Sequence, residues 1–185
     1  MGDIFSPGVR DEWIEAVLDR VRRFPHTQFL FLTKNPERYR DFVSKMHENA
    51  ILGATIETNR DNLYVERRIS YAPLPSSRYI AMKELRWPYK FISIEPILDF
   101  DLEIFTSWLR DIAPRLVYIG YDNYDWRLPE PPLSKTMKLV EELRKITKVE
   151  LKSMRRAWHE GRASRSPRTR VEDYEGFKSY SGVYA

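Results

Sequence analysis

Five short runs of apolar, β-branched and aromatic residues recur along the chain, and their spacing constrains its fold more than any other feature. Each run has the length and composition of a buried β-strand, and segments with a helical spacing of apolar residues lie between the runs. The runs are residues 28–34, 50–58, 90–96, 115–122 and 148–152. Strands that alternate with helices form a parallel sheet with right-handed crossovers, so the sequence predicts an α/β fold.

The residues within these runs alternate between two kinds, which indicates how the two faces of the sheet differ. In the second run the apolar Leu52 and Ala54 alternate with Gly53, Thr55 and Glu57. The third and fourth runs repeat the pattern, with small residues that give way to acidic ones toward the carboxyl end. This is typical of a partial (β/α) barrel with about five to six parallel strands and outer helices. A doubly wound Rossmann-type sheet is the alternative, but the turn TKNPERY after the first run lacks its glycine fingerprint.

Polar and charged residues gather where the predicted strands end, and parallel strands bring their carboxyl ends to one edge. Carboxylates there can bind amino or hydroxyl groups, and a lysine can bind a carboxylate or a phosphate. The alternative is a set of structural ion pairs that closes this end of the barrel. The candidate residues for a small-molecule site are Asp3, Lys34, Gly53, Thr55, Glu57, Ser93, Glu95, Gly120, Asp122, Asn123 and Lys152. Asp3 belongs to this set if MGDIF is the end of a further strand.

The chain contains no cysteine, which excludes disulfides, thiolate metal sites, a cysteine nucleophile and an iron–sulfur cluster bound by its own cysteines. Its three histidines have no closely spaced carboxylate partner, so no metal site is predicted. The common serine-nucleophile, phosphate-loop and zinc-peptidase motifs are absent, and no catalytic residue is assigned. The sequence has no run of about 18 apolar residues and no secretory signal, so we expect a soluble, cytoplasmic protein without a membrane partner.

Positive charge is concentrated in the C-terminal part of the chain. Residues 152–185 hold 8 Lys/Arg and 4 Asp/Glu, whereas residues 1–151 hold 23 of each kind, so the net charge of +4 lies in that segment. We divide the chain into a barrel domain, residues 1–158, and a basic, aromatic tail, residues 159–185. Phosphate contacts and aromatic stacking are means of non-specific nucleic-acid binding, and the candidates are Arg155, Arg156, Trp158, Arg162 and Arg165. The alternative interpretation is a solvated terminus.

The order of the motifs MGDIF, FLFLTKNPERY, ILGATIET, AMKEL, FISIEP, VYIGYDN, LPEPP and VELKSM resembles radical S-adenosylmethionine (SAM) enzymes, in the phage-associated branch related to spore photoproduct lyase. The resemblance implies a partial barrel whose strand ends hold SAM beside a [4Fe–4S] cluster. It places Asp3 at the SAM amino group, Glu57 at the fourth-strand contact, and Ser93 and Glu95 at the fifth. In such proteins a C-x-x-x-C-x-x-C loop binds the cluster. This sequence lacks that loop, and we expect it to begin at the end of the family's second strand.

These observations predict functions of different classes. The first is the C-terminal portion or a split subunit of a radical-SAM-like protein, whose polar pocket binds SAM or a similar small molecule. Such a chain is an enzyme only together with a cluster-bearing segment. The alternative is a nucleic-acid-binding accessory protein that works through its basic tail, and the third is a remnant without activity. Because the run 28–34 would form an exposed edge, we also expect a homodimer, a chain that supplies the missing strands, or coverage by the tail.

Overall fold

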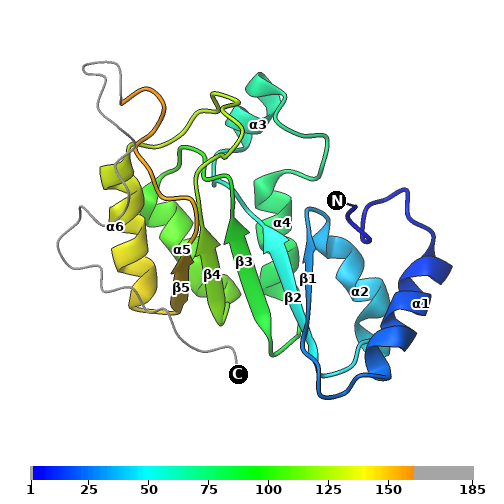
Figure 1. Cartoon of the computed structure of the whole chain (residues 1–185). Coiled ribbons are helices and arrows are strands. Elements are labelled where there is room, and N and C mark those ends of the chain that lie inside the picture. Colours follow the sequence, from blue (N-terminus) through cyan, green and yellow to red (C-terminus); the bar gives the residue numbers. More distant parts are fainter. Residues whose placement is uncertain (1, 161–185) are drawn as a thin grey trace.

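The computed structural model describes residues 2–160 and contains a five-stranded parallel sheet (Figure 1). The strands are β1 (Phe29–Thr33), β2 (Ala50–Thr55), β3 (Lys90–Ile94), β4 (Leu116–Ile119) and β5 (Lys148–Leu151). The helices are α1 (Asp11–Arg22), α2 (Tyr39–Phe42), α3 (Asp61–Arg67), α4 (Pro75–Glu84), α5 (Leu102–Ile112) and α6 (Leu133–Arg144), with the 3-10 helices η1 (Pro36–Arg38) and η2 (Val43–Lys45) on either side of α2. Each strand falls inside one of the five predicted runs, which confirms that prediction.

The strands lie side by side in their sequence order, β1-β2-β3-β4-β5, and each neighbouring pair is parallel. Because each right-handed crossover leads to the next strand, successive helices fall on the same face of the sheet. Figure 1 looks onto the opposite face, with α4 and α5 behind the strands. A doubly wound sheet would reverse its strand order, so the Rossmann-type alternative is excluded. The sheet is open, and the fold is the predicted partial (β/α) barrel.

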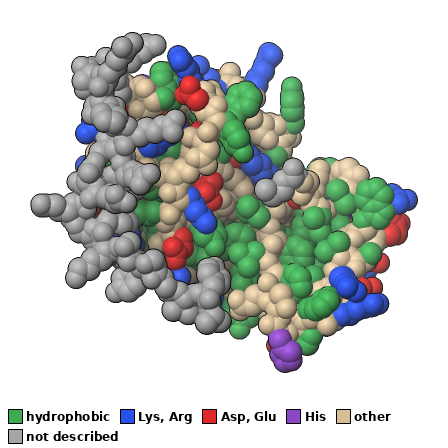
Figure 2. All heavy atoms as spheres, in the orientation of Figure 1, with side chains coloured by type: hydrophobic (Ala, Val, Ile, Leu, Met, Phe, Trp, Pro, Cys, Tyr) green, Lys and Arg blue, Asp and Glu red, His purple; other side chains and the backbone are tan. Residues whose placement is uncertain are grey.

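The two faces of the sheet differ as the sequence alternation predicts. The face that meets the helices carries fully buried apolar side chains, namely Leu52, Ala54, Ile92, Ile94, Val117 and Ile119. On the opposite face, which we call the open face, Leu30 and Leu32 of the edge strand β1 keep 50% and 45% of their surface exposed. Figure 2 shows hydrophobic side chains gathered over the open face. The core of the protein therefore lies between the sheet and the helices.

A glycine in β2 makes room for a large side chain on the open face. Gly53 is in register with Phe91 of β3, and a Cβ at Gly53 would lie 2.2 Å from the Phe91 ring. The ring also makes an edge-to-face contact with Tyr118 of β4, with 6.0 Å between the centroids. The close approach of Phe91 is the physical reason for a glycine at this strand position.

Residues 2–5 do not form a strand, so the expectation that this segment ends a further strand is wrong. The amide of Phe5 donates to the Asp3 carboxylate at 2.9 Å, and the amide of Ser6 donates to the Asp3 carbonyl at 3.0 Å. Hydrogen bonds from backbone to a nearby Asp side chain favour a turn over extended backbone. The turn allows the Phe5 ring to pack edge-on against Phe31 and Tyr39.

Several helices begin or end at residues suited to those positions. Pro75 opens α4, where a missing backbone N–H costs nothing, and Pro132 directly precedes α6. Helix α5 ends at Ile112, and the next residue, Ala113, has the left-handed conformation that commonly terminates a helix although it is usually taken by glycine. No helix within residues 2–160 is long and apolar enough to cross a membrane.

Replacement of Gly53 by alanine is expected to destabilise the fold by about 1–3 kcal/mol, because the new methyl group would push the Phe91 ring out of its place. Urea denaturation followed by circular dichroism measures this loss. Gly8→Ala is the matched control, since no atom lies within 4 Å of a Cβ built at Gly8. Addition of Phe91→Leu should recover part of the loss, and equal stability of Gly53→Ala and Gly8→Ala would contradict this explanation.

Candidate functional site

Several of the candidate residues singled out in the sequence lie at the carboxyl ends of neighbouring strands. Lys34 follows β1, Glu57 follows β2 and Glu95 follows β3, whereas Gly120 and Lys152 directly follow β4 and β5. We call these five residues the carboxyl edge. The strands are in register and parallel, so the carboxyl edge is a continuous row across the sheet. The structure therefore brings these five residues to one edge of the sheet.

Glu57 is a buried carboxylate held between two cations. Its side chain is 1% exposed, and its two oxygens lie 2.6 Å from the Lys34 ammonium and 2.8 Å from the Arg78 guanidinium. Arg78 in α4 is fully buried, and it also donates to the carbonyls of Thr55 at 2.9 Å and Pro73 at 2.6 Å. A buried charge is tolerated only when it is paired and hydrogen-bonded, as Glu57 is. The group Lys34–Glu57–Arg78, here called the ion triad, joins β1, β2 and α4.

A tyrosine in α3 packs against the ion triad. The Arg78 guanidinium lies 5.0 Å from the centre of the Tyr64 ring, a distance suited to a cation–π contact. The Tyr64 hydroxyl is buried and has no hydrogen-bond partner among the described residues. Burial, together with the nearby Glu57 carboxylate, raises the pKa of this hydroxyl. Tyr64 therefore stays neutral beside the triad.

Asp3 also lies at the end of β1, although it reaches that place from a turn. Its carboxylate accepts the Thr33 hydroxyl at 2.8 Å and the Lys34 amide at 3.0 Å, in addition to the Phe5 amide. These three hydrogen bonds fasten the N-terminal segment to the sheet. Asp3 thus lies at this edge, and its carboxylate is occupied by contacts within the chain.

Glu95 and Lys152 differ from the other charges of the carboxyl edge because neither forms an ion pair with any residue in the range 2–160. The Glu95 carboxylate accepts the Ser93 hydroxyl at 3.0 Å, and the Lys152 ammonium lies 4.6 Å from the centre of the Tyr118 ring. Gly120 lies between them, since a Cβ built there would be 3.1 Å from Glu95 Oε1 and 3.1 Å from Lys152 Cβ. The absence of a side chain at Gly120 therefore makes room for an acidic group on one side and a basic residue on the other.

Asp122, another acidic candidate, fixes the loop that follows β4. Its two carboxylate oxygens accept the amides of Tyr124 at 3.0 Å and Trp126 at 2.7 Å. The neighbouring Asn123 is exposed. Thr55, another candidate, is buried in β2 beside the ion triad.

The predicted nucleic-acid residues have different environments. Arg155 pairs with the buried Glu130 through distances of 2.5 and 2.8 Å, and this contact raises the pKa of the Arg155 guanidinium. Arg156 and Trp158 are exposed, and the Trp158 indole donates to the carbonyl of Leu128 at 2.7 Å. Arg162 and Arg165, like most of the predicted tail, lie outside the described residues.

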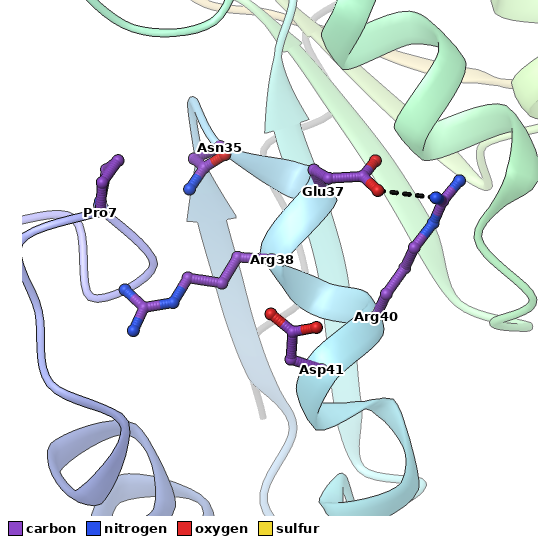
Figure 3. Close-up of a pocket in the computed structure, with 6 residues that line it drawn as sticks. All are labelled: Pro7, Asn35, Glu37, Arg38, Arg40 and Asp41. Carbon is purple, nitrogen blue, oxygen red and sulfur yellow. Dashed lines mark hydrogen bonds and ion pairs between the residues drawn. The ribbon is translucent and has the colours of Figure 1, made fainter.

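A shallow hollow of about 380 Å³ lies beside η1, at the same end of the sheet (Figure 3). It is lined by Pro7, Asn35, Glu37, Arg38, Arg40 and Asp41. Arg38 reaches across to the N-terminal segment and donates to the carbonyls of Ser6 and Val9, each at 2.5 Å. Arg40 pairs with Glu37 at 2.6 Å, the contact drawn in Figure 3. Because both arginines already have partners, this hollow offers no available cation to a ligand.

The carboxyl edge has no features of a metal centre. Within the part of the chain that the structure describes, no group of three or more histidines and carboxylates can hold a metal ion. The full sequence has no cysteine and hence no thiolate ligand for a [4Fe–4S] cluster. The donor set present here therefore does not fit that cluster.

Sequence reasoning missed Arg78, Tyr64 and Tyr118 as parts of this site. A signal for Arg78 exists in the helical spacing, because it shares the buried face of α4 with Ala81 and Met82. An arginine on an apolar helix face needs a buried acceptor, and Glu57 is that acceptor.

Comparisons with known proteins place the chain in a family. A family model described as "Protein of unknown function (DUF5131)" matches residues 1–126, more than half of the 185-residue chain. That range includes the first four strands, the ion triad, Glu95 and Gly120. No curated protein and no solved structure matched the chain.

Replacement of Arg78 by methionine is expected to cost about 3–5 kcal/mol of folding free energy, because it leaves the buried Glu57 with Lys34 alone. Chemical denaturation measures the loss. Arg40→Met is the control, since the Arg40 side chain is 43% exposed and a surface ion pair contributes below about 1 kcal/mol. Addition of Glu57→Gln to Arg78→Met should restore part of the stability. Similar losses for Arg78→Met and Arg40→Met would rule out the ion triad as a buried charge cluster.

Proposed function

The chain belongs to the DUF5131 family, and we propose that its carboxyl edge binds SAM or a similar small molecule that carries an α-amino and an α-carboxylate group. The observation that supports this proposal is the pair Glu95 and Lys152. These charges lack ionic partners within residues 2–160 and stand on either side of Gly120. Their opposite signs suit a ligand that is itself a zwitterion.

Each group has a distinct role in this proposal. The Glu95 carboxylate accepts hydrogen bonds from the ligand's ammonium, while the Ser93 hydroxyl fixes the other side of the carboxylate at 3.0 Å. The Lys152 ammonium binds the ligand's carboxylate. A cation–π contact with the Tyr118 ring holds this ammonium in place. Hydrogen bonds between oppositely charged groups are stronger than those between neutral groups. Two such bonds therefore fix both the position and the orientation of the ligand.

The other charges of the carboxyl edge have partners within the fold. The ion triad contains two cations and one carboxylate, and the Asp3 carboxylate lies beside it at the end of β1, where it accepts the Lys34 amide. Glu95 and Lys152 are therefore the charges of this edge that remain for a ligand.

The proposed activity of this chain by itself is binding. The resemblance to radical SAM enzymes implies a [4Fe–4S] cluster, which this cysteine-free chain does not ligate through thiolates, so no reaction step is assigned to its residues. On this proposal the chain is the SAM-binding part or subunit of a radical-SAM-like protein. The open edge of β1, with the half-exposed Leu30 and Leu32, is where a second copy or a chain with further strands would add.

Isothermal titration calorimetry with SAM tests the proposal. We expect Glu95→Ala and Lys152→Ala each to weaken binding by at least about 10-fold, because each removes a charge-assisted hydrogen bond. Adenosine, which lacks the amino-acid group, should bind no better to the parent than to these variants.

Matched controls exist in exposed charges away from the carboxyl edge. Glu48→Ala removes an exposed carboxylate that precedes β2 at the opposite end of the sheet, and Lys138→Ala removes an exposed lysine of α6. Both controls should bind SAM as the parent does. Absence of heat at millimolar SAM, or equal affinity in all four variants, would refute the proposal.

A further inference from the structure

The two outer strands of the sheet differ in how they are protected from pairing with another chain. On β5 the side chains of Lys148 and Glu150 are charged, and they form an ion pair at 2.8 Å. Charged side chains on an outer strand discourage the addition of a further strand. The other outer strand, β1, has the sequence FLFLT, without a charged residue or a proline. β1 therefore lacks the residues that usually keep a sheet edge unpaired.

The backbone of β1 has hydrogen-bonding groups that point away from the sheet. The Phe29 amide donates to the carbonyl of the residue that precedes β2, at 3.0 Å, so Phe29 faces β2. Because the bonds of a parallel strand pair involve alternate residues, the amides and carbonyls of Leu30 and Leu32 face outward. Outside the sheet ladder, no residue in the range 2–160 forms a hydrogen bond with them. The next outward amide, that of Lys34, is bonded to the Asp3 carboxylate, which closes the end of this edge.

Helix α1 has an exposed apolar face on the same side of the molecule. Trp13 is 54% exposed, and Val17, one turn further along the helix, is 40% exposed. They lie beside the buried Ile14 and on the side of the helix opposite Glu15, whose carboxylate pairs with Lys45. In Figure 1 α1 lies beyond β1, on the side away from β2, and Figure 2 shows hydrophobic side chains gathered between β1 and α1.

The position of α1 decides what this edge accepts. Ile14 and Leu18 of α1 belong to the core against which Phe31 of β1 packs, so α1 is part of the helix layer that covers one face of the sheet. A second copy that paired with β1 would bring its own helix layer to the place where α1 lies. An extended segment without a helix of its own meets no such obstacle. The edge therefore fits a single strand of another chain.

We propose that β1 and α1 together bind an extended, mostly apolar segment of another chain, which joins the sheet as a strand beside β1. Its backbone forms hydrogen bonds with the amides and carbonyls of Leu30 and Leu32. Because successive side chains of a strand point to opposite faces, one set packs beside these leucines and the other against Trp13 and Val17. Both sets are apolar because the surfaces that receive them are apolar. The inference names the partner of the β1 edge and does not rest on SAM binding.

Fluorescence anisotropy with a labelled peptide tests this inference on the full chain. The probe is a run of alternating valine and isoleucine residues with a glutamate at each end for solubility, and we expect saturable binding. The same peptide with a proline at its centre should bind at least about 10-fold more weakly, because it lacks an amide for the added strand. Amide hydrogen exchange at Leu30 and Leu32 should slow when the first peptide is added, which a contact through side chains alone would not cause.

Two matched double variants locate the site. Leu30→Lys/Leu32→Lys should weaken peptide binding at least about 10-fold, because each lysine places a charge beside the added apolar strand. Ile104→Lys/Val65→Lys is the control, since Ile104 in α5 and Val65 in α3 are 51% and 64% exposed and belong to other elements. It should bind the peptide as the parent does. Trp13→Ala should also weaken binding, because it removes apolar contact area.

Both double variants should bind SAM as the parent does, so this inference and the proposed function can fail separately. Absence of peptide binding by the parent, equal binding of the proline peptide, equal affinities of the two double variants, or unchanged exchange at Leu30 and Leu32 would overturn the inference.

Discussion

The carboxyl edge depends on the ion pairs of the buried Glu57 carboxylate. Glu57 follows β2 and pairs with Lys34, at the end of β1, and with Arg78, in α4, at distances of 2.6 and 2.8 Å. An open sheet has no closing strand to fix the ends of its first strands, and the ion triad supplies that restraint. Because Arg78 is fully buried, the α4 crossover cannot shift without leaving a charge unpaired in the interior.

The other charges at this end of the molecule divide into those used by the fold and those left free. Asp3 fastens the N-terminal segment, Asp122 holds the loop that follows β4, and Glu130 binds Arg155. Glu95 and Lys152 form no ion pair within residues 2–160, although they occupy the same row. The structural interpretation therefore applies to the first group, and the ligand site is our proposal for Glu95 and Lys152. The proposed ligand site consists of these two residues, which are the charges of the row that the structural contacts leave without an ion pair.

Periodicity predicted the strands and their two faces because both depend on local alternation, which Leu52 and Gly53 in β2 already display. The partner of Glu57 was not predicted, since Arg78 lies 21 residues away and a buried arginine pairs by tertiary packing. The strand expected at Asp3 is absent because the Asp3 carboxylate accepts the Phe5 amide and forms a turn. Tyr124 and Trp126 belong to no periodic pattern, so their exposure in the loop after β4 was not predicted.

Amide chemical-shift mapping of the ¹⁵N-labelled protein locates the site at which a zwitterionic ligand binds. On addition of SAM, we expect the largest shifts at Gly120, Glu95 and Lys152, with a smaller response at Lys34. Shifts confined to the hollow around Arg38, or no shifts in a folded protein at millimolar SAM, would show that the pair beside Gly120 does not bind the ligand.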